Sequence, residues 1–108
     1  MYFSNFAEME FKKKKEGIFF KSITGDKIQL AYIKLKPNQI TNHSHINEQM
    51  GYIISGKVEL TIGEEKKICS AGMAYFIPSN IQHGFRVLSD EDLEYIEIFS
   101  PPKKEAKI

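Results

Sequence analysis

The feature that most constrains the fold is a series of short β-rich runs separated by turn signals at close intervals. Glycine, proline and asparagine punctuate the series, for example at Gly25, Pro37 and Gly63. The runs cover residues 17–23, 28–35, 49–54, 57–62, 66–68, 73–77, 83–88 and 93–99. Regular short strands of this kind are typical of a β-sandwich or barrel. No amphipathic pattern of three helical turns occurs, so we predict an all-β protein.

The chain has 108 residues, which is enough for one hydrophobic core and not for two. No linker or internal repeat divides it, and we predict a single domain over residues 1–108. Residues 1–16 form an N-terminal arm or edge strand, 17–99 form the barrel, and 100–108 form a polar tail that we expect to fray. Within the arm, residues 4–11 are compatible with one helical turn. We expect the run Lys12–Lys15 to be a solvated stretch.

Charge and composition exclude several classes of function. The formal net charge is +1 and Arg86 is the only arginine, which leaves no basic face for nucleic acid. No apolar stretch approaches the roughly 20 residues of a membrane helix, and the N-terminus lacks the pattern of a signal peptide. The only cysteine, Cys69, permits no disulfide within one chain. We therefore expect a cytoplasmic protein that binds neither nucleic acid nor membrane.

The histidines are spaced as metal ligands often are. His43 and His45 stand two apart, and alternate side chains of a strand share one face. Gln49 follows four positions after His45, whereas His83 joins them only if a barrel closes across the core. From the spacing of His43 and His45 alone, a structural role for these residues stays open.

Two motifs of the chain resemble those of the cupin superfamily, in particular its small RmlC-like members. The first motif has His-x-His, an acidic or amide residue, then six residues and a glycine, and residues 43–56 read HSHINEQMGYIISG. The second has glycine, five residues, proline, one residue, glycine, two residues and histidine, and residues 72–83 read GMAYFIPSNIQH. The resemblance implies a double-stranded β-helix, or jelly roll, with one divalent metal ion held by His43, His45, Gln49 and His83.

The departures from these motifs remove no ligand. Asn80 replaces a glycine of the second motif, and Asn38 lies near the position of a glycine in the first. Val87 replaces an asparagine that is common at the end of the second motif. Asparagine tolerates a positive φ better than most residues. We therefore expect Asn80 to adopt the backbone conformation of the glycine that it replaces.

The fourth ligand is either Glu48 or Gln49. Six residues separate Gln49 from Gly56, as in the motif, and strand alternation places Glu48 on the opposite face. We favour Gln49, which leaves the +2 charge of the ion uncompensated and favours an anionic or chelating ligand. The mixed nitrogen and oxygen donors suit Fe, Mn, Ni, Zn or Cu.

On a strand over residues 93–99, alternation places Glu97 on the same face as Tyr95 and Phe99, and that face is otherwise apolar. Buried carboxylates are rare unless they are paired or bound to a metal. From the residues alone, a solvated Glu97 on a partly exposed face stays open.

The end of the chain resembles the small cupins of pectin and alginate breakdown, which convert 4,5-unsaturated uronates to linear keto-uronates. Their sequence Asp-x-Phe-Ser-Pro-Pro-Arg corresponds to Glu97, Phe99 and Lys103 here, so the resemblance implies catalytic roles for these three residues. Lysine lacks the bidentate geometry of arginine, and glutamate moves the carboxylate by one methylene. A displacement of about 1 Å can cost about a hundredfold in rate, so the substrate stays open.

We therefore expect a metal-dependent enzyme that acts on a small anionic sugar acid. In it, Glu97 moves a proton, Phe99 shapes the pocket and Lys103 pairs with the carboxylate of the ligand. The alternatives are another metal-dependent cupin enzyme such as an oxygenase, a non-catalytic binding or sensor protein, and a structural domain with a vestigial metal site. Apolar outward positions such as Ile96 and Ile98 lead us to expect a homodimer.

Overall fold

Residues 2–105 and 108 are described here from a computed structural model. The strands are β1 Lys12–Lys15, β2 Ile18–Thr24, β3 Gln29–Leu35, β4 Ile40–His43, β5 Glu48–Ser55, β6 Lys57–Ile62, β7 Glu65–Ser70, β8 Ala74–Ile77, β9 His83–Val87 and β10 Leu93–Ser100. No α-helix occurs in this part of the chain, which confirms the all-β prediction. Within the same residues, no helix has the length and apolar character needed to cross a membrane.

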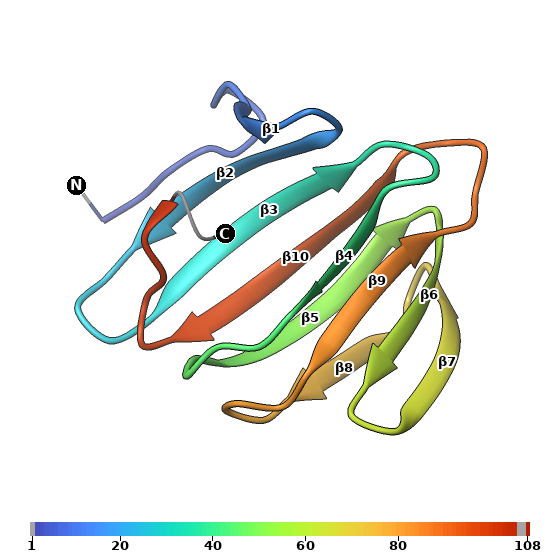
Figure 1. The fold of residues 1–108 in the computed structure, drawn as a ribbon. Helices are drawn as coiled ribbons and strands as arrows, with labels where there is room; N and C mark the ends of the chain where they lie inside the picture. Colours follow the sequence, from blue (N-terminus) through green and yellow to red (C-terminus); the bar gives the residue numbers. More distant parts are fainter. Residues whose placement is uncertain (1, 106–107) are drawn as a thin grey trace.

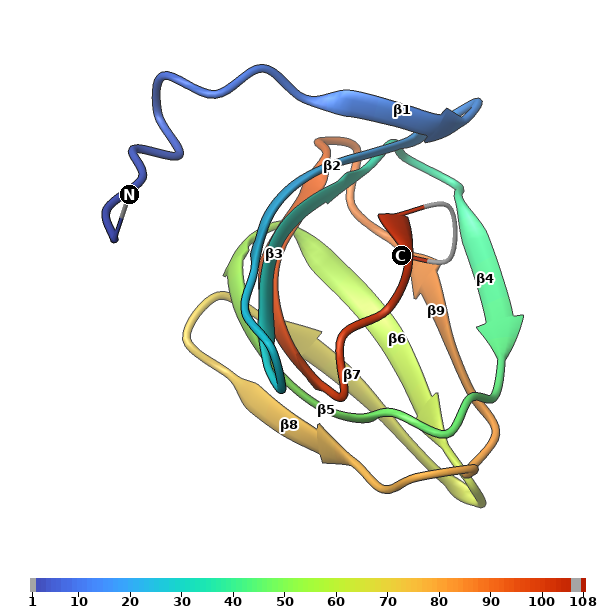
Figure 2. The same ribbon diagram turned by 90° about the vertical axis from the view of Figure 1, so that its left-hand side faces the viewer.

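The strands form two antiparallel sheets that curve around a common interior (Figure 1). The larger sheet has the order β1-β2-β3-β10-β5-β8, and the smaller has the order β4-β9-β6-β7. In Figure 2 the C-terminal segment lies between β3 and β10 on one side and β4 and β9 on the other. This arrangement is the predicted jelly roll, and it brings segments from both ends of the chain to one barrel.

Alternate side chains of the strands fill the interior of the barrel. Every second side chain of β3 is buried, and β10 follows the same pattern over most of its length. The largest of the fully buried apolar side chains are Phe99, Ile33, Leu35, Ile53, Ile77 and Leu93. Burying one such side chain contributes about 1.5–3 kcal/mol, so the core fixes which face of each strand points inward. Asn38 and Asn80 have φ values of 68° and 66°, which confirms that asparagine takes the conformation of a motif glycine at position 80.

Two strands, β1 and β4, lie outside the β-rich runs of the sequence. The segment Lys12–Lys15 pairs with β2 as the edge strand of the larger sheet, and its side chains are exposed apart from the half-buried Lys14, so the stretch is solvated as expected. β4 pairs with β9, with His43 opposite His83. Four consecutive lysines show no alternation of polarity, and β4 is short and mostly polar, so neither segment carried the usual strand signal.

The expectation that the tail frays is wrong for its described residues. The Gln29 side chain, which is 1% exposed, donates to the Lys103 carbonyl and accepts from the Lys103 N–H, both over 3.0 Å. The side chains of Lys103 and Ile108 are buried. On the outside, Lys12 forms a salt bridge of 2.9 Å with Glu105. The tail therefore folds back over the barrel, where it can contribute to a site.

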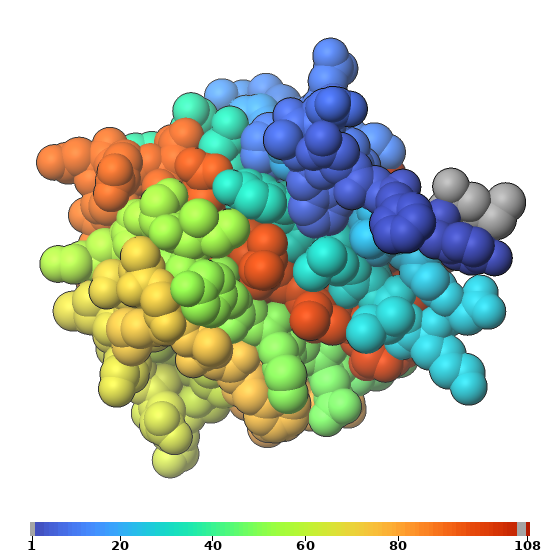
Figure 3. Space-filling model, turned by 180° about the vertical axis from the view of Figure 1, so that it is seen from behind, coloured from blue at the N-terminus to red at the C-terminus, as the bar shows by residue number. Residues whose placement is uncertain are grey.

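Apolar side chains gather on the outer face of the larger sheet, which Figure 3 shows from behind with β3, β10, β5 and β8 exposed. Ile98 pairs with Met50, and Met50 pairs with Phe76, so these three exposed side chains lie side by side. Exposed apolar patches commonly mark interaction sites. We propose that this face forms a two-fold homodimer.

Replacement of Gln29 by leucine should destabilise the fold. The Lys103 N–H and carbonyl would lose both partners in a buried position, at a cost of about 1–3 kcal/mol in the free energy of unfolding. Urea denaturation measures the change. Gln82→Leu is the control, since it removes only an exposed hydrogen bond to Asn42. Equal midpoints for Gln29→Leu and the wild type would show that the tail does not depend on this contact.

Replacement of Ile98 by glutamate should convert the dimer to a monomer at micromolar concentration. A charge in the centre of an apolar interface loses its hydration without gaining a partner. Light scattering measures the mass. Ile68→Glu, at an exposed apolar residue of the smaller sheet, should leave the dimer intact. A wild type that is monomeric under these conditions contradicts the proposal.

Candidate functional site

The three histidines meet between the two sheets. The ring centroids of His43 and His83 are 4.6 Å apart, and the other two pairs are separated by 4.9 and 5.2 Å. One nitrogen of each ring lies within 4.8 Å of the others. His43 ends β4 and His83 begins β9, but His45 lies in the loop after β4, not on the strand as the spacing suggested. The chain leaves the smaller sheet at this point to start β5 in the larger one.

Hydrogen bonds to backbone carbonyls determine which nitrogen of His45 and of His83 carries the proton. His45 Nδ1 contacts the Asn47 carbonyl at 3.0 Å, and His83 Nδ1 contacts the Ile81 carbonyl at 2.8 Å. A carbonyl only accepts, so each Nδ1 carries the proton and each Nε2 presents a lone pair. The Nε2 atoms of both residues are buried without a hydrogen-bond partner. Burial and the charge of Lys103 lower the pKa of His43 to about 3, so its ring is also neutral near pH 7.

Gln49 supplies a third unsatisfied lone-pair atom, beside the Nε2 atoms of His45 and His83. Its side chain is 3% exposed and lies inside the barrel, whereas Glu48 is exposed on the outer face, as alternation predicted. The Gln49 Nε2 donates to the Glu97 carboxylate, and its Oε1 is buried without a partner. The free atoms of Gln49, His45 and His83 are all lone-pair donors, which is the donor set that a transition metal requires.

Glu97 is buried at the centre of β10, with 4% of its side chain exposed. The possibility of a solvated Glu97 is therefore excluded. The Tyr75 hydroxyl donates to Glu97 Oε2 over 2.6 Å, and the Gln49 amide donates to the same oxygen. Burial raises the pKa of the Glu97 carboxyl to about 7, although these two hydrogen bonds and the charge of Lys103 oppose the increase. Glu97 is thus a carboxyl group close to the neutral range beside a possible metal ligand.

Small residues make room for this arrangement. Across the larger sheet, one row runs from Ser22 through Ala31, Glu97 and Gly51 to Tyr75. A Cβ atom at Gly51 would lie 2.1 Å from the Tyr75 hydroxyl. Only glycine therefore allows Tyr75 to reach from β8 across β5 to Glu97. Tyr75 was not predicted as a residue of the site, although its alternation with Met73 and Ile77 indicated a shared face of the strand.

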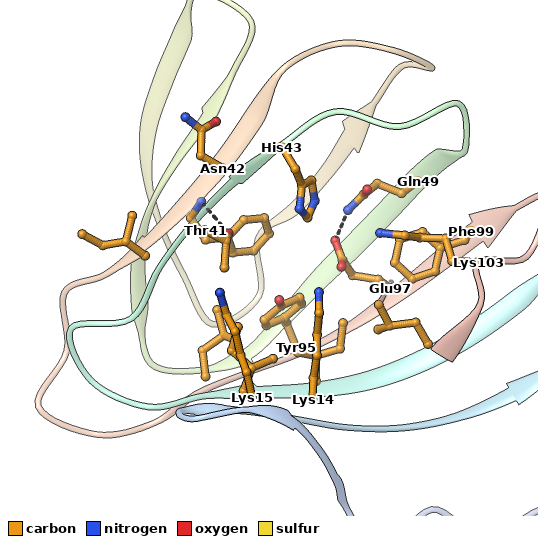
Figure 4. A pocket seen from close by; sticks show the side chains of 16 residues that line it. Lys14, Lys15, Thr41, Asn42, His43, Gln49, Tyr95, Glu97, Phe99 and Lys103 are labelled. Atoms are coloured by element: carbon orange, nitrogen blue, oxygen red, sulfur yellow. Dashed lines mark hydrogen bonds between the residues drawn. The ribbon is translucent and has the colours of Figure 1, made fainter. Parts of the chain in front are cut away.

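A cavity of about 150 Å³ opens beside these groups (Figure 4). Its polar side includes His43, Gln49, Glu97 and Lys103, and its apolar side includes Tyr95, Phe99 and Ile108. The Lys103 ammonium lies 5.0 Å from the centre of the Phe99 ring. The structure thus brings together all three residues implied as catalytic. Lys14 and Lys15 of β1 also line the cavity, which was not predicted from the sequence.

Comparisons with known proteins agree with this geometry. The pectin degradation protein KdgF of Dickeya dadantii (strain 3937) is 34% identical over 91 residues, which cover 82% of this chain and 82% of that protein. The H2HPP isomerase of Bacillus subtilis is 31% identical over 81 residues, or 73% of this chain but 34% of that protein. The chain therefore spans about a third of the length of that relative.

The fold has close counterparts among solved structures. KdgF from Halomonas sp. has a TM-score of 0.89 and 25% sequence identity, and the match covers 100% of this chain and 99% of that one. A family model described as a cupin domain matches residues 31–99, which include both motifs and all three histidines. The chain belongs to the cupin domain family.

Proposed function

We propose that this cupin is a metal-dependent enzyme that opens or isomerises the ring of a small anionic sugar acid such as an unsaturated uronate. The proposal rests on one observation. The buried carboxylate of Glu97 is hydrogen-bonded to the Gln49 amide nitrogen, and the Gln49 oxygen, like the Nε2 atoms of His45 and His83, is buried without a hydrogen-bond partner. Similarity to a pectin degradation protein over 82% of the chain supports the choice of substrate class.

The donor set fits one divalent transition metal ion, Fe, Mn, Ni, Zn or Cu, held by His43, His45, Gln49 and His83. Bound there, the ion would supply Lewis-acid polarisation of a hydroxyl or carbonyl oxygen. The protein ligands are neutral, so a ligand that brings its own negative charge is favoured.

The remaining residues would orient the ligand and move a proton. Both hydrogen bonds to the Glu97 carboxylate end on Oε2, which leaves Oε1 as the oxygen that exchanges a proton with the ligand. The Lys103 ammonium would pair with the ligand's carboxylate. Phe99, which is 1% exposed, forms a rigid wall of the cavity.

The metal assignment predicts about one divalent ion per purified chain. His83→Ala and Gln49→Ala should each lose most of this metal, because each removes a buried donor atom. Glu48→Ala is the matched control and should keep it, since Glu48 is exposed on the other face. Elemental analysis measures the content. Loss of metal in Glu48→Ala with retention in Gln49→Ala would reverse the assignment.

The role of Glu97 predicts that Glu97→Gln abolishes turnover of unsaturated uronate while metal content stays close to that of the wild type. A positioned acid–base group typically contributes about a hundredfold to ten-thousandfold in rate. Glu97→Asp introduces the aspartate that the uronate-converting cupins have at this position, and it should keep or improve turnover. The loss of ultraviolet absorbance of the unsaturated sugar follows the reaction.

Absence of uronate turnover would contradict the proposed substrate. If neither the wild type nor the variant with both Glu97→Asp and Lys103→Arg converts unsaturated uronate, that substrate is wrong. An isomerase acting on another acid is then the second candidate, since similarity to H2HPP isomerase extends over 81 residues.

A further inference from the structure

The strand β1 has a β-bulge at the point where two of its lysines line the cavity of about 150 Å³. Lys13 pairs with Phe19 and Lys15 pairs with Ile18, so the register passes over Lys14. Two residues of β1 then stand opposite Ile18, whose side chain is buried and lines the cavity. A bulge of this kind redirects side chains and is common beside functional sites. Here Lys14, which is half-buried, and Lys15, which is exposed, both line the cavity, whereas Lys13 pairs with Glu16.

Lys14 and Lys103 share one location although they come from opposite ends of the chain. Both line the inner cavity, and both also line an outer cavity of about 530 Å³ that includes His43, His45 and Pro102. In Figure 4 the two side chains approach the space between His43 and Glu97 from different sides.

The two segments are also tied to each other. Lys12 donates to both carboxylate oxygens of Glu105, over 2.9 and 3.1 Å, which links β1 to the segment that carries Lys103. Gln29 fixes the backbone of Lys103 itself. An exposed ion pair adds little stability, so this contact marks the two lysine-bearing segments as neighbours, and the buried Gln29 contacts hold the tail in place.

We propose that Lys14 is a second carboxylate-binding residue, so that Lys14 and Lys103 each bind one oxygen of the carboxylate of the sugar acid. One lysine is a point charge and cannot bind both oxygens as the planar guanidinium of arginine does. Two ammonium groups on different segments can bind one oxygen each. This inference rests on the proposed function, because it assumes that the ligand is a sugar acid.

Calorimetric binding of galacturonate and of its uncharged methyl ester to the purified protein tests the assignment. The wild type should bind galacturonate more tightly than the ester. Lys14→Gln should weaken galacturonate binding about tenfold, the size of one lost ion contact of about 1.4 kcal/mol, and should leave ester binding unchanged. Lys13→Gln is the matched control on the same strand and should change neither affinity.

A second variant separates this role from a structural one. Lys103→Arg combined with Lys14→Gln should bind galacturonate more tightly than Lys14→Gln alone, because one guanidinium can supply both contacts. The assignment is overturned if Lys14→Gln binds galacturonate like the wild type. It is equally overturned if that variant loses ester binding to the same degree, or if the wild type does not prefer galacturonate. Failure of the proposed reaction is seen separately, as absent turnover of unsaturated uronate with binding intact.

Discussion

The candidate site depends on the register in which β10 lies between β3 and β5. In that register Glu97 stands beside Gly51, and Phe99 stands beside Gln49. A shift by one residue would turn Glu97 outward and expose Tyr95 and Phe99, which are 5% and 1% exposed. Each of these rings contributes about 1.5–3 kcal/mol through burial. The apolar core therefore determines where the carboxylate lies, and the polar contacts follow from it.

Charge in the pocket is arranged so that one set of groups serves two purposes. A cation site needs neutral imidazoles, and burial together with nearby lysines disfavours protonation of His43. The same lysines give the cavity a positive character suited to an anion. Glu97 is a carboxylate inside this environment, and its hydrogen bonds to Tyr75 and Gln49 keep it oriented. Anion binding and metal binding are thus compatible in one small space.

The sequence predicted those parts of the site that rest on short-range pattern. The spacing of strands and turns predicted a β-sandwich or barrel, and the resemblance of the two motifs implied the jelly roll. Alternation separated Gln49 from Glu48 and grouped Glu97 with Tyr95 and Phe99, and the structure shows that Gln49 and Glu97 lie on the inner faces. What it missed depends on pairing between distant segments. Gln29 and Lys103 are separated by 74 positions. The β1 bulge is a property of two strands together, and a run of identical lysines has no periodicity from which a face can be assigned.

The row of small residues across the larger sheet leaves little tolerance for larger side chains around Glu97. Glu97 and the glycine that admits Tyr75 lie on β10 and β5, whereas Ala31 and Ser22 continue the row on β3 and β2. Ala31 is 0% exposed and is not among the residues that line the cavity, so a larger side chain there would find no open volume and would press against the Glu97 side chain beside it. Overpacking of this kind typically costs about 1–3 kcal/mol. Position 31 therefore constrains the candidate site although it contributes none of its polar groups.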